Sequence, residues 1–239
     1  MKIIKKYDIA VFVLSFLLVV IFFGLYQKVQ QNDAYIYYKY AFNIFNGNGY
    51  VFNIGEKANA ATSTLYTIML ALLFSLFKWI PFLSLPIIGH IIGAISIWII
   101  SIASLRMYKN SNFLFVPFVL PFIFISNPLL KNSVGMETFL TLAMISLCLL
   151  FYQQKKIFLT SLFLGLSILA RPDSIILAII LTLDFIKNAR KFPSIRYFIG
   201  FLLVVLPWVL FSFIYFGSPC LRLCSLKLHR LKVAVGEKA

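Results

Sequence analysis

Acidic side chains are scarce in this chain, so the places where they stand are informative. Of 239 residues, 22 are Lys or Arg and only seven are Asp or Glu. Several of the acids fall at the ends of apolar segments, where a carboxylate can accept the proton of a hydroxyl and an arginine can bind a phosphate. The residues that this argument selects as candidates for catalysis or binding are Asp33, Glu56, Lys57, Glu137, Arg171 and Asp173.

Asp33 follows the outer end of the first apolar segment and is the candidate for acid–base chemistry. At this level a lipid-borne substrate presents its head group, and the Asp33 carboxylate can accept the proton of an incoming hydroxyl. It can also be a solvated loop acid, or the N-cap of a helix that begins at Ala34. Spacing alone favours this second interpretation.

Arg171 stands in the sequence Arg171-Pro172-Asp173 between two apolar segments. An arginine at the outer boundary of a membrane runs against the usual charge bias of membrane proteins. It pairs with Asp173 or Glu137, or it binds a phosphate with two nitrogens, and the residues alone leave both open. Pro172 is typical of a helix start, where Asp173 also interacts favourably with the helix dipole.

The composition indicates a single membrane domain. Apolar residues make up 62% of the chain and charged residues only 12%, about half the charged share of a soluble domain. We therefore expect an all-α fold, a polytopic transmembrane helix bundle with about seven crossings. The expected crossings are Ile9–Tyr26, Leu85–Leu105, Phe113–Ser126, Phe139–Tyr152, Phe158–Ala170, Ile175–Ile186 and Tyr197–Phe216.

The positions of the basic residues predict the orientation of this bundle. With the N-terminus inside and seven crossings, the basic clusters fall on the cytoplasmic side, as membrane proteins favour. Asp33, Glu56, Glu137 and Asp173 then lie outside. The predicted location is a bacterial-type cytoplasmic (inner) membrane, with the lipid bilayer as a partner and the active face outside. No nucleic-acid partner is expected, because the net charge of +15 is scattered over short loops and forms no single basic face.

The first outer loop, residues 27–61, is the longest polar segment. Its sequence predicts a short amphipathic surface helix over Ala34–Phe45, followed by turns at Asn46–Gly49 and Asn53–Gly55. The next apolar stretch, Leu65–Ile80, has the composition of another crossing. A crossing there would place the later basic loops outside, so we expect an interfacial or re-entrant helix that stops before Pro81, with Lys78 reaching the head groups.

The histidines and cysteines do not predict a metal centre. His90 lies inside an apolar segment, and a packed, hydrogen-bonded histidine is the simpler interpretation. Cys148 also lies in an apolar helix, and Cys220 and Cys224 lie near the C-terminus. We predict neither a disulfide nor a metal site, since the sequence has no metal-ligand spacing.

Six short motifs, in this order, resemble the GT-C superfamily of membrane glycosyltransferases. They cover most of the chain from Ile9 to Pro219, and the combination is more specific than any one of them. The motifs are Asn32-Asp33-Ala34-Tyr35-Ile36, the segment from Asn46 to Glu56, Thr62-Ser63-Thr64-Leu65-Tyr66, Gly135-Met136-Glu137-Thr138, Leu169-Ala170-Arg171-Pro172-Asp173 and Tyr215-Phe216-Gly217-Ser218-Pro219. Thr64 stands where relatives commonly have Pro, which leaves the start of the interfacial helix less certain.

The resemblance implies transfer of a sugar from a polyprenyl-phosphate donor to an acceptor hydroxyl at the outer surface. It implies that Asp33 is the general base, and that Glu56 and Glu137 orient the acceptor or the sugar. Arg171, together with Lys57, would offset the charge that develops on the leaving phosphate, and Asp173 belongs to the same substrate-binding group. No cofactor is expected. The sugar, and whether the acceptor is a glycan, a lipid or a protein, stay open.

The last twenty residues differ in character from the rest. We expect a GT-C-like domain over residues 1–219 and an atypical basic tail over residues 220–239. A frameshift near the codon for Cys220 would explain the tail and would leave an apparently truncated chain whose activity is in doubt. The alternatives to a glycosyltransferase are a multi-pass transporter, which places its polar residues near the bilayer midplane, and a non-catalytic membrane scaffold.

Overall fold

All regular elements in the described part of this computed structural model are helices, joined by loops. The described part covers residues 33–107, 135–189 and 195–217, with single positions before residue 33 and between 107 and 135. The helices are α2 (Ala34–Phe45), α3 (Thr64–Phe77), α4 (Leu85–Met107), α7 (Thr138–Gln153), α8 (Ile157–Ala170), the 3-10 turn η1 (Pro172–Ser174), α9 (Ile175–Ala189) and α10 (Ile195–Phe216).

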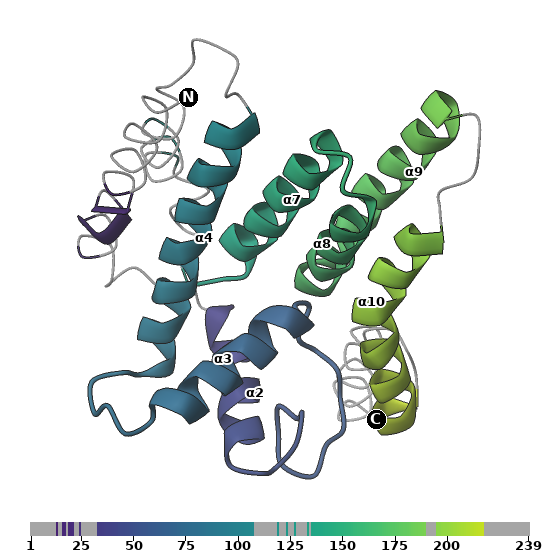
Figure 1. Cartoon of the computed structure of the whole chain (residues 1–239). Coiled ribbons are helices and arrows are strands. Elements are labelled where there is room, and N and C mark those ends of the chain that lie inside the picture. The colour runs from purple at the N-terminus through teal and green to yellow at the C-terminus, as the bar shows by residue number, and fades with distance from the viewer. Residues whose placement is uncertain are drawn as a thin grey trace, which may run out of the picture.

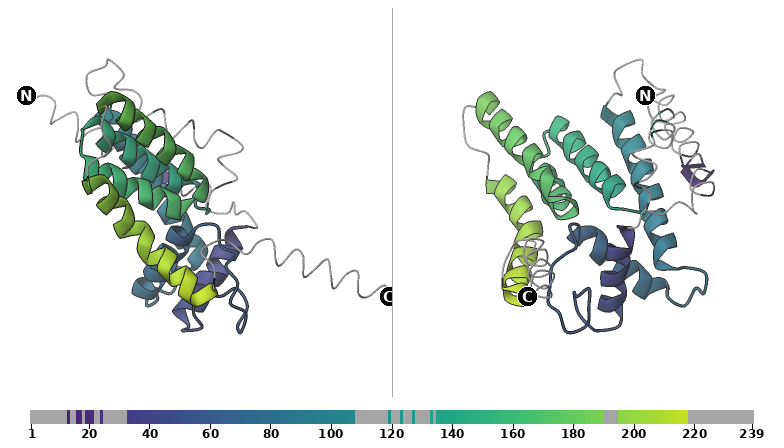
Figure 2. Two further views of the ribbon diagram at one scale, coloured as in Figure 1. Left: turned by 90° about the vertical axis from the view of Figure 1, so that its right-hand side faces the viewer. Right: turned by 180° about the vertical axis from the view of Figure 1, so that it is seen from behind.

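Five helices form a layer whose two ends differ. In Figure 1, α4 lies on the left, α7 and α8 in the middle, and α9 and α10 on the right, and α2 and α3 lie across the end at which α7 begins and α8 ends. Figure 2 shows the same arrangement from the side and from behind. We call this end, with α2, α3 and residues 135–138 and 171–174, the Arg171 end. The opposite end is the basic end, where α4 and α9 stop in turns that carry Arg106 and Lys187.

Helix lengths explain the space that α2 and α3 occupy. Helix α4 has 23 residues and α7 has 16, so at 1.5 Å per residue α7 is about 10 Å shorter. The end of the layer is therefore recessed between α4 and α10, and α2 and α3 fill the recess. Tyr40, Tyr66, Leu70 and Ile88 are buried in the core that joins them to the layer.

The helices α8 and α10 approach each other closely through two glycines. A Cβ atom at Gly200 would lie 2.6 Å from the carbonyl oxygen of Phe158, and one at Gly165 would lie 3.3 Å from that of Phe201. Small residues at such crossings let helix backbones pack tightly in membrane proteins. This packing holds α8 against α10, and Arg171 follows the last residue of α8.

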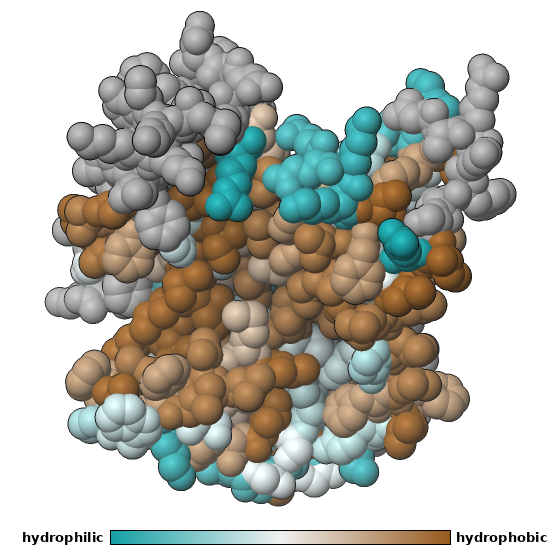
Figure 3. Space-filling view, in the orientation of Figure 1, coloured by the Kyte–Doolittle hydropathy of each residue, from teal (hydrophilic) through white to brown (hydrophobic). Residues whose placement is uncertain are grey.

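A broad apolar belt crosses the face of the molecule seen in Figure 3. Figure 3 shows brown, hydrophobic surface across the middle of the molecule and teal, polar surface along its upper and lower edges. On α10, Ile214 and Phe213 are 82% and 62% exposed, and on α9 Ile176 and Leu183 are 61% and 60% exposed. Apolar surface of this extent is rarely left in contact with water.

Two described helices, α4 and α10, are long and apolar enough to cross a membrane. Five of the predicted crossings coincide closely with α4, α7, α8, α9 and α10. Helices α7, α8 and α9, however, are short for a full span. The predicted crossings Ile9–Tyr26 and Phe113–Ser126 lie, apart from single positions, outside the described residues, as does the tail at residues 220–239. The count of seven crossings stays a prediction.

The helix predicted over Ala34–Phe45 and the two turns after it are present, whereas their position at the outer membrane surface stays a prediction. Helix α2 has the predicted bounds, and Gly47, Gly49 and Gly55 have φ angles of +76°, +82° and +92°, which suit glycine in turns. Helix α3 begins at Thr64 without a proline, because the Ser63 hydroxyl accepts a hydrogen bond from the Tyr66 amide at 3.3 Å. It ends before Pro81, and it lies across the layer in Figure 1.

Candidate functional site

Arg171 pairs with two carboxylates at the Arg171 end. Its Nε and Nη2 atoms lie 3.2 and 3.0 Å from the two carboxylate oxygens of Asp173, and Nη1 lies 3.6 Å from Oε1 of Glu137. Both ion pairs that the sequence left open are therefore formed. The hydrogen bond to Asp173 raises the pKa of Arg171 by more than partial burial lowers it, so the guanidinium stays charged. We call Arg171, Asp173 and Glu137 the Arg171 cluster.

Proline creates the bend that brings Arg171 and Asp173 together. A residue before proline avoids the helical conformation, and Arg171 is extended, with φ −151° and ψ 125°. Its amide still closes the last turn of α8, since it donates to the Ser167 carbonyl at 2.8 Å. Pro172 then starts η1 and Asp173 lies in its first turn, as the sequence predicts.

Glu137 is the most buried acid of the cluster, with 3% of its surface exposed. Its carboxylate lies near the Tyr37 hydroxyl, but its Oε2 atom makes no hydrogen bond of normal geometry to a described residue, which is costly for a buried carboxylate oxygen. Burial first, and then the charge of Glu137, raise the pKa of Tyr37. Tyr37 therefore keeps its proton, and its hydroxyl lies 2.5 Å from that of Thr62.

Two tyrosines hold the loop that carries Glu137. The hydroxyls of Tyr66 and Tyr38 donate to the carbonyl of Gly135 at 2.6 and 3.1 Å. Gly135 has a φ of +84°, and a Cβ atom there would lie 2.9 Å from the Tyr38 hydroxyl. Only glycine fits these constraints without strain. The tyrosines of α2 and α3 thus set the position of Glu137 from the side of the first outer loop.

Asp33 is joined to this site through α2. It occupies the N-cap position, but its side chain makes no capping hydrogen bond, and it is exposed. The N-cap interpretation therefore holds for its backbone, whose carbonyl accepts from the Ile36 amide at 3.2 Å, and not for its carboxylate. Residues four apart share a helix face, so Asp33 lies on the face of α2 that carries Tyr37.

Glu56 and Lys57 lie elsewhere in the first outer loop. Glu56 is exposed and accepts a hydrogen bond from the Asn53 amide group at 3.0 Å. The ammonium of Lys57 lies 4.8 Å from the centre of the Tyr215 ring, at the end of α10. Within the described part of the chain, the ion pairs of Arg171 are with Glu137 and Asp173 only.

An apolar groove begins at the Arg171 cluster. It has a volume of about 470 Å³, in the range of small-molecule sites. Arg171, Asp173 and Ser174 line one part of it. The rest is formed by facing residues of α7 and α9, which are Thr138, Thr141, Leu142, Ile145, Ile176, Leu177 and Ile180. A charged group thus stands where a hydrocarbon-lined channel starts.

This arrangement suits a ligand with a polar head and an apolar chain. With all three groups ionised, one positive and two negative charges give the cluster a net charge of −1. The Nε–H of Arg171 donates to Asp173, and its two Nη atoms form the ion pairs with Glu137 and Asp173, so N–H groups on the Nη atoms remain for a phosphate. The carboxylates can accept hydrogen bonds from sugar hydroxyls. Among the described residues, no three His, Cys, Asp or Glu side chains lie close enough to hold a metal ion.

Three further polar or titratable residues of the helical layer, His90, Cys148 and Asp184, lie in its packed interior or bond to neighbouring helices. His90 is buried and its Nδ1 lies 2.6 Å from the Pro86 carbonyl oxygen, so the prediction of a packed, hydrogen-bonded histidine is confirmed. Cys148 is buried in α7. Asp184 accepts a hydrogen bond from the Tyr152 hydroxyl near the basic end.

Comparison with protein-family models, with curated proteins and with solved structures finds no match to this chain. The site is therefore interpreted from its own residues. Sequence reasoning missed the roles of Tyr37, Tyr38 and Tyr66. Their only signal was the excess of tyrosine between residues 35 and 66, because a hydrogen bond to Gly135, 69 residues beyond Tyr66, leaves no local pattern.

Proposed function

We propose that this chain is a membrane glycosyltransferase of the GT-C type. It moves a sugar from a polyprenyl-phosphate donor to an acceptor hydroxyl at the outer face of a cytoplasmic membrane. The observation that carries the proposal is the Arg171 cluster at the start of the α7–α9 groove. A polyprenyl phosphate has the matching parts, a phosphate for the free N–H donors of Arg171 and a hydrocarbon chain for the groove.

In the proposed reaction the acceptor oxygen attacks the anomeric carbon of the donor sugar. A new carbon–oxygen bond forms, the bond from that carbon to the phosphate oxygen breaks, and polyprenyl phosphate leaves with the electron pair. Asp33 takes the proton of the acceptor hydroxyl as general base. Arg171 stabilises the phosphate charge, and Glu137 and Asp173 orient sugar hydroxyls. Glu56 is proposed to help orient the acceptor or the sugar, and Lys57 to add positive charge near the phosphate, although their observed contacts are with Asn53 and Tyr215.

The orientation in the membrane follows from the two ends of the layer. Arg106, Lys155, Lys156 and Lys187 lie at the basic end, which we place in the cytoplasm. The Arg171 end then faces outward, with the cluster recessed by about 10 Å relative to the full length of α4. Helix α3 is the interfacial or re-entrant helix. In the proposed orientation, the cluster lies at the depth of lipid head groups in the outer leaflet.

The proposal is tested by the binding of undecaprenyl phosphate to the purified full chain in lipid nanodiscs, measured by native mass spectrometry. Arg171→Lys keeps the charge but loses the planar fork of donors. We expect it to weaken binding by about tenfold. Asp173→Asn removes a competing carboxylate and is expected to tighten binding by about threefold.

Arg106→Lys, at the basic end, is the matched control and is expected to bind like the unaltered chain. Thermal melting of each variant separates loss of binding from loss of folding. The proposal is wrong if a folded Arg171→Lys variant binds undecaprenyl phosphate normally, or if Arg106→Lys weakens binding equally.

The role of Asp33 is tested by Asp33→Asn. The substitution removes the base and leaves the exposed end of α2 otherwise intact, so we expect transfer to fall by about 10²–10⁴-fold. Sugar transfer from a radiolabelled polyprenyl-phosphate sugar is measured in membranes that contain the full chain or the variant. Near-normal turnover would remove Asp33 from the mechanism without affecting the proposal for Arg171.

A further inference from the structure

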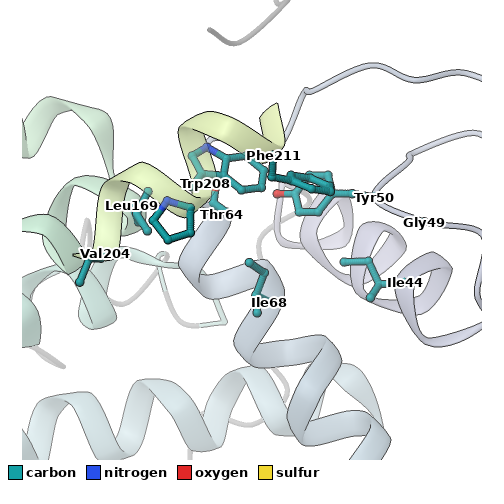
Figure 4. A pocket seen from close by; sticks show the side chains of 10 residues that line it. Ile44, Gly49, Tyr50, Thr64, Ile68, Leu169, Val204, Trp208 and Phe211 are labelled. Carbon is teal, nitrogen blue, oxygen red and sulfur yellow. The ribbon is translucent and has the colours of Figure 1, made fainter. Parts of the chain in front are cut away.

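A second apolar cavity lies between the first outer loop, α3, α8 and α10. It has a volume of about 480 Å³ and shares no lining residue with the α7–α9 groove. Its walls include Ile68 of α3, Leu169 of α8 and Trp208 of α10 (Figure 4). We call this cavity the chamber. Its size is typical of sites that bind small molecules.

One buried hydroxyl in the chamber is incompletely hydrogen-bonded. Tyr50 is 4% exposed, and its hydroxyl lies near the hydroxyls of Thr64 and Thr67 but makes no hydrogen bond of normal geometry to a described residue. Figure 4 shows the hydroxyl end of Tyr50 pointing toward Thr64 and Trp208, and the Tyr50 and Trp208 rings lie 5.3 Å apart. A buried hydroxyl that is incompletely hydrogen-bonded is unfavourable, so an oxygen atom of a ligand in the chamber would satisfy it.

The chamber adjoins the apolar surface of α10. Leu203, Leu206 and Leu210 are 59%, 46% and 53% exposed, and they alternate along the helix with the chamber residues Val204, Pro207, Trp208 and Phe211. In a membrane these leucines contact lipid chains. A hydrocarbon chain can therefore pass from the bilayer into the chamber without crossing a polar boundary.

The chamber also lies next to the residues of the proposed active site. Thr64, in its wall, stands two residues after Thr62, which bonds Tyr37. Leu169, also in its wall, stands two residues before Arg171. Two separate segments thus connect the chamber with the site. A ligand whose chain fills the chamber can present its polar end to the cluster.

We propose that the chamber binds the hydrocarbon chain of the acceptor, so that the acceptor is a lipid that carries the reacting hydroxyl. This inference rests on the proposed function and names its acceptor class. The donor chain occupies the α7–α9 groove, which contacts Arg171 directly. An oxygen near the polar end of the acceptor accepts the hydrogen bond of Tyr50.

The test uses photo-cross-linking of the full chain in nanodiscs with two probes. One is a hexadecanol that carries a diazirine in its chain, and the other is the corresponding hexadecane without the hydroxyl. Mass spectrometry of proteolytic peptides maps the adducts. We expect the alcohol to label peptides that contain Trp208 and Ile68 more than peptides from the exposed face of α9.

Two matched tryptophan variants separate the chamber from the groove. Ile68→Trp fills the chamber and Ile176→Trp fills the α7–α9 groove, and both isoleucines are partly exposed, at 39% and 61%. We expect Ile68→Trp to reduce labelling of the Trp208 peptide by about fivefold or more, and Ile176→Trp to leave it unchanged. Equal loss in both variants, loss in neither, or loss only in Ile176→Trp would each overturn the proposal.

The Tyr50 hydroxyl provides an independent measurement. Tyr50→Phe is expected to lower the apparent affinity for the alcohol by about three- to tenfold and to leave capture of the hydrocarbon probe unchanged. Equal capture of the alcohol by Tyr50→Phe and by the unaltered chain would exclude this hydrogen bond and overturn the assignment.

A competition experiment distinguishes acceptor from donor. Undecaprenyl phosphate, at concentrations that saturate the Arg171-dependent site, is expected to leave labelling of the chamber unchanged. Displacement of the alcohol would show that the donor chain fills the chamber and would overturn the proposal. Labelling of the chamber does not depend on Arg171. The proposed function fails in a different experiment, in which Arg171→Lys would bind undecaprenyl phosphate as well as the unaltered chain does.

Discussion

The two ends of the helical layer hold their charged residues in different ways. At the basic end, Arg106, Lys155 and Lys156 are exposed, and Lys156 lies against the Phe151 ring at 5.6 Å. At the Arg171 end, Glu137 is buried at 3% exposure and tyrosines from two other helices fix its loop. Exposed charges tolerate substitution, whereas a buried charge must be held by specific partners. The charges at the basic end therefore indicate how the chain is oriented, whereas those at the Arg171 end form the candidate functional site.

The largest difference between the two ends is expected from matched acid-to-amide substitutions. Glu137→Gln keeps the shape of the side chain but removes the carboxylate that is proposed to orient the sugar, and transfer should fall by about 10²-fold. Asp184→Asn, near the basic end, should leave transfer within about twofold, because Asp184 bonds Tyr152 away from the cluster. Sugar transfer in membranes measures both. Equal losses would remove the distinction between the ends.

Gly135→Ala is expected to have the next largest effect. The new Cβ would meet the Tyr38 hydroxyl in a left-handed backbone conformation, so the free energy of unfolding should fall by about 2–3 kcal/mol. Gly47→Ala, with φ +76° and open space around it, should lose only about 1 kcal/mol. Thermal melting in detergent compares them. A Gly135 variant as stable as the Gly47 variant would contradict the packing of Tyr38 against this loop.

Removal of single tyrosine hydroxyls sharpens the comparison. Tyr66→Phe deletes a 2.6 Å hydrogen bond to Gly135 and should lower the free energy of unfolding by about 1 kcal/mol, with weaker binding of undecaprenyl phosphate. Tyr152→Phe, near the basic end, should lower stability by a similar amount and leave binding unchanged. Melting and native mass spectrometry on the same samples separate the two effects. Unchanged binding of undecaprenyl phosphate by Tyr66→Phe would show that the tyrosine hydroxyls do not influence binding at the Arg171 cluster.

The smallest effect is expected in the dependence of stability on pH. Burial raises the pKa of Tyr38 from 10.0 to about 12. A tyrosine in the unfolded chain loses its proton near pH 10, whereas the folded chain keeps it, so the contribution of Tyr38 is complete below pH 10 and is lost as pH rises toward 12. Melting temperatures between pH 9 and pH 12 should fall less steeply for Tyr38→Phe. Parallel curves would mean that Tyr38 is not buried as described.

Sequence reasoning predicted several helices and the Arg171–Asp173 ion pair, but it did not predict how Glu137 is buried and held. Apolar length and turn residues predicted α2, α4 and α10, because these signals are local. The pairing of Arg171 with Asp173 was also foreseeable, since the two stand beside one proline. The burial of Glu137 and its support by Tyr66 were not, because they depend on how α3 packs against the loop that precedes α7. Glu56 was grouped with the site by resemblance, yet its observed contact is with the nearby Asn53.

The central claim is that the Arg171 cluster faces the outer surface while the basic end faces the cytoplasm. It is tested by labelling single cysteines with a membrane-impermeant maleimide in intact spheroplasts, after the three native cysteines are changed to serine. Asp173→Cys replaces a side chain that is 60% exposed and should react in intact cells, whereas Lys155→Cys should react only after permeabilisation. Labelling of both positions from the same side, or of Lys155→Cys alone in intact cells, would contradict the account.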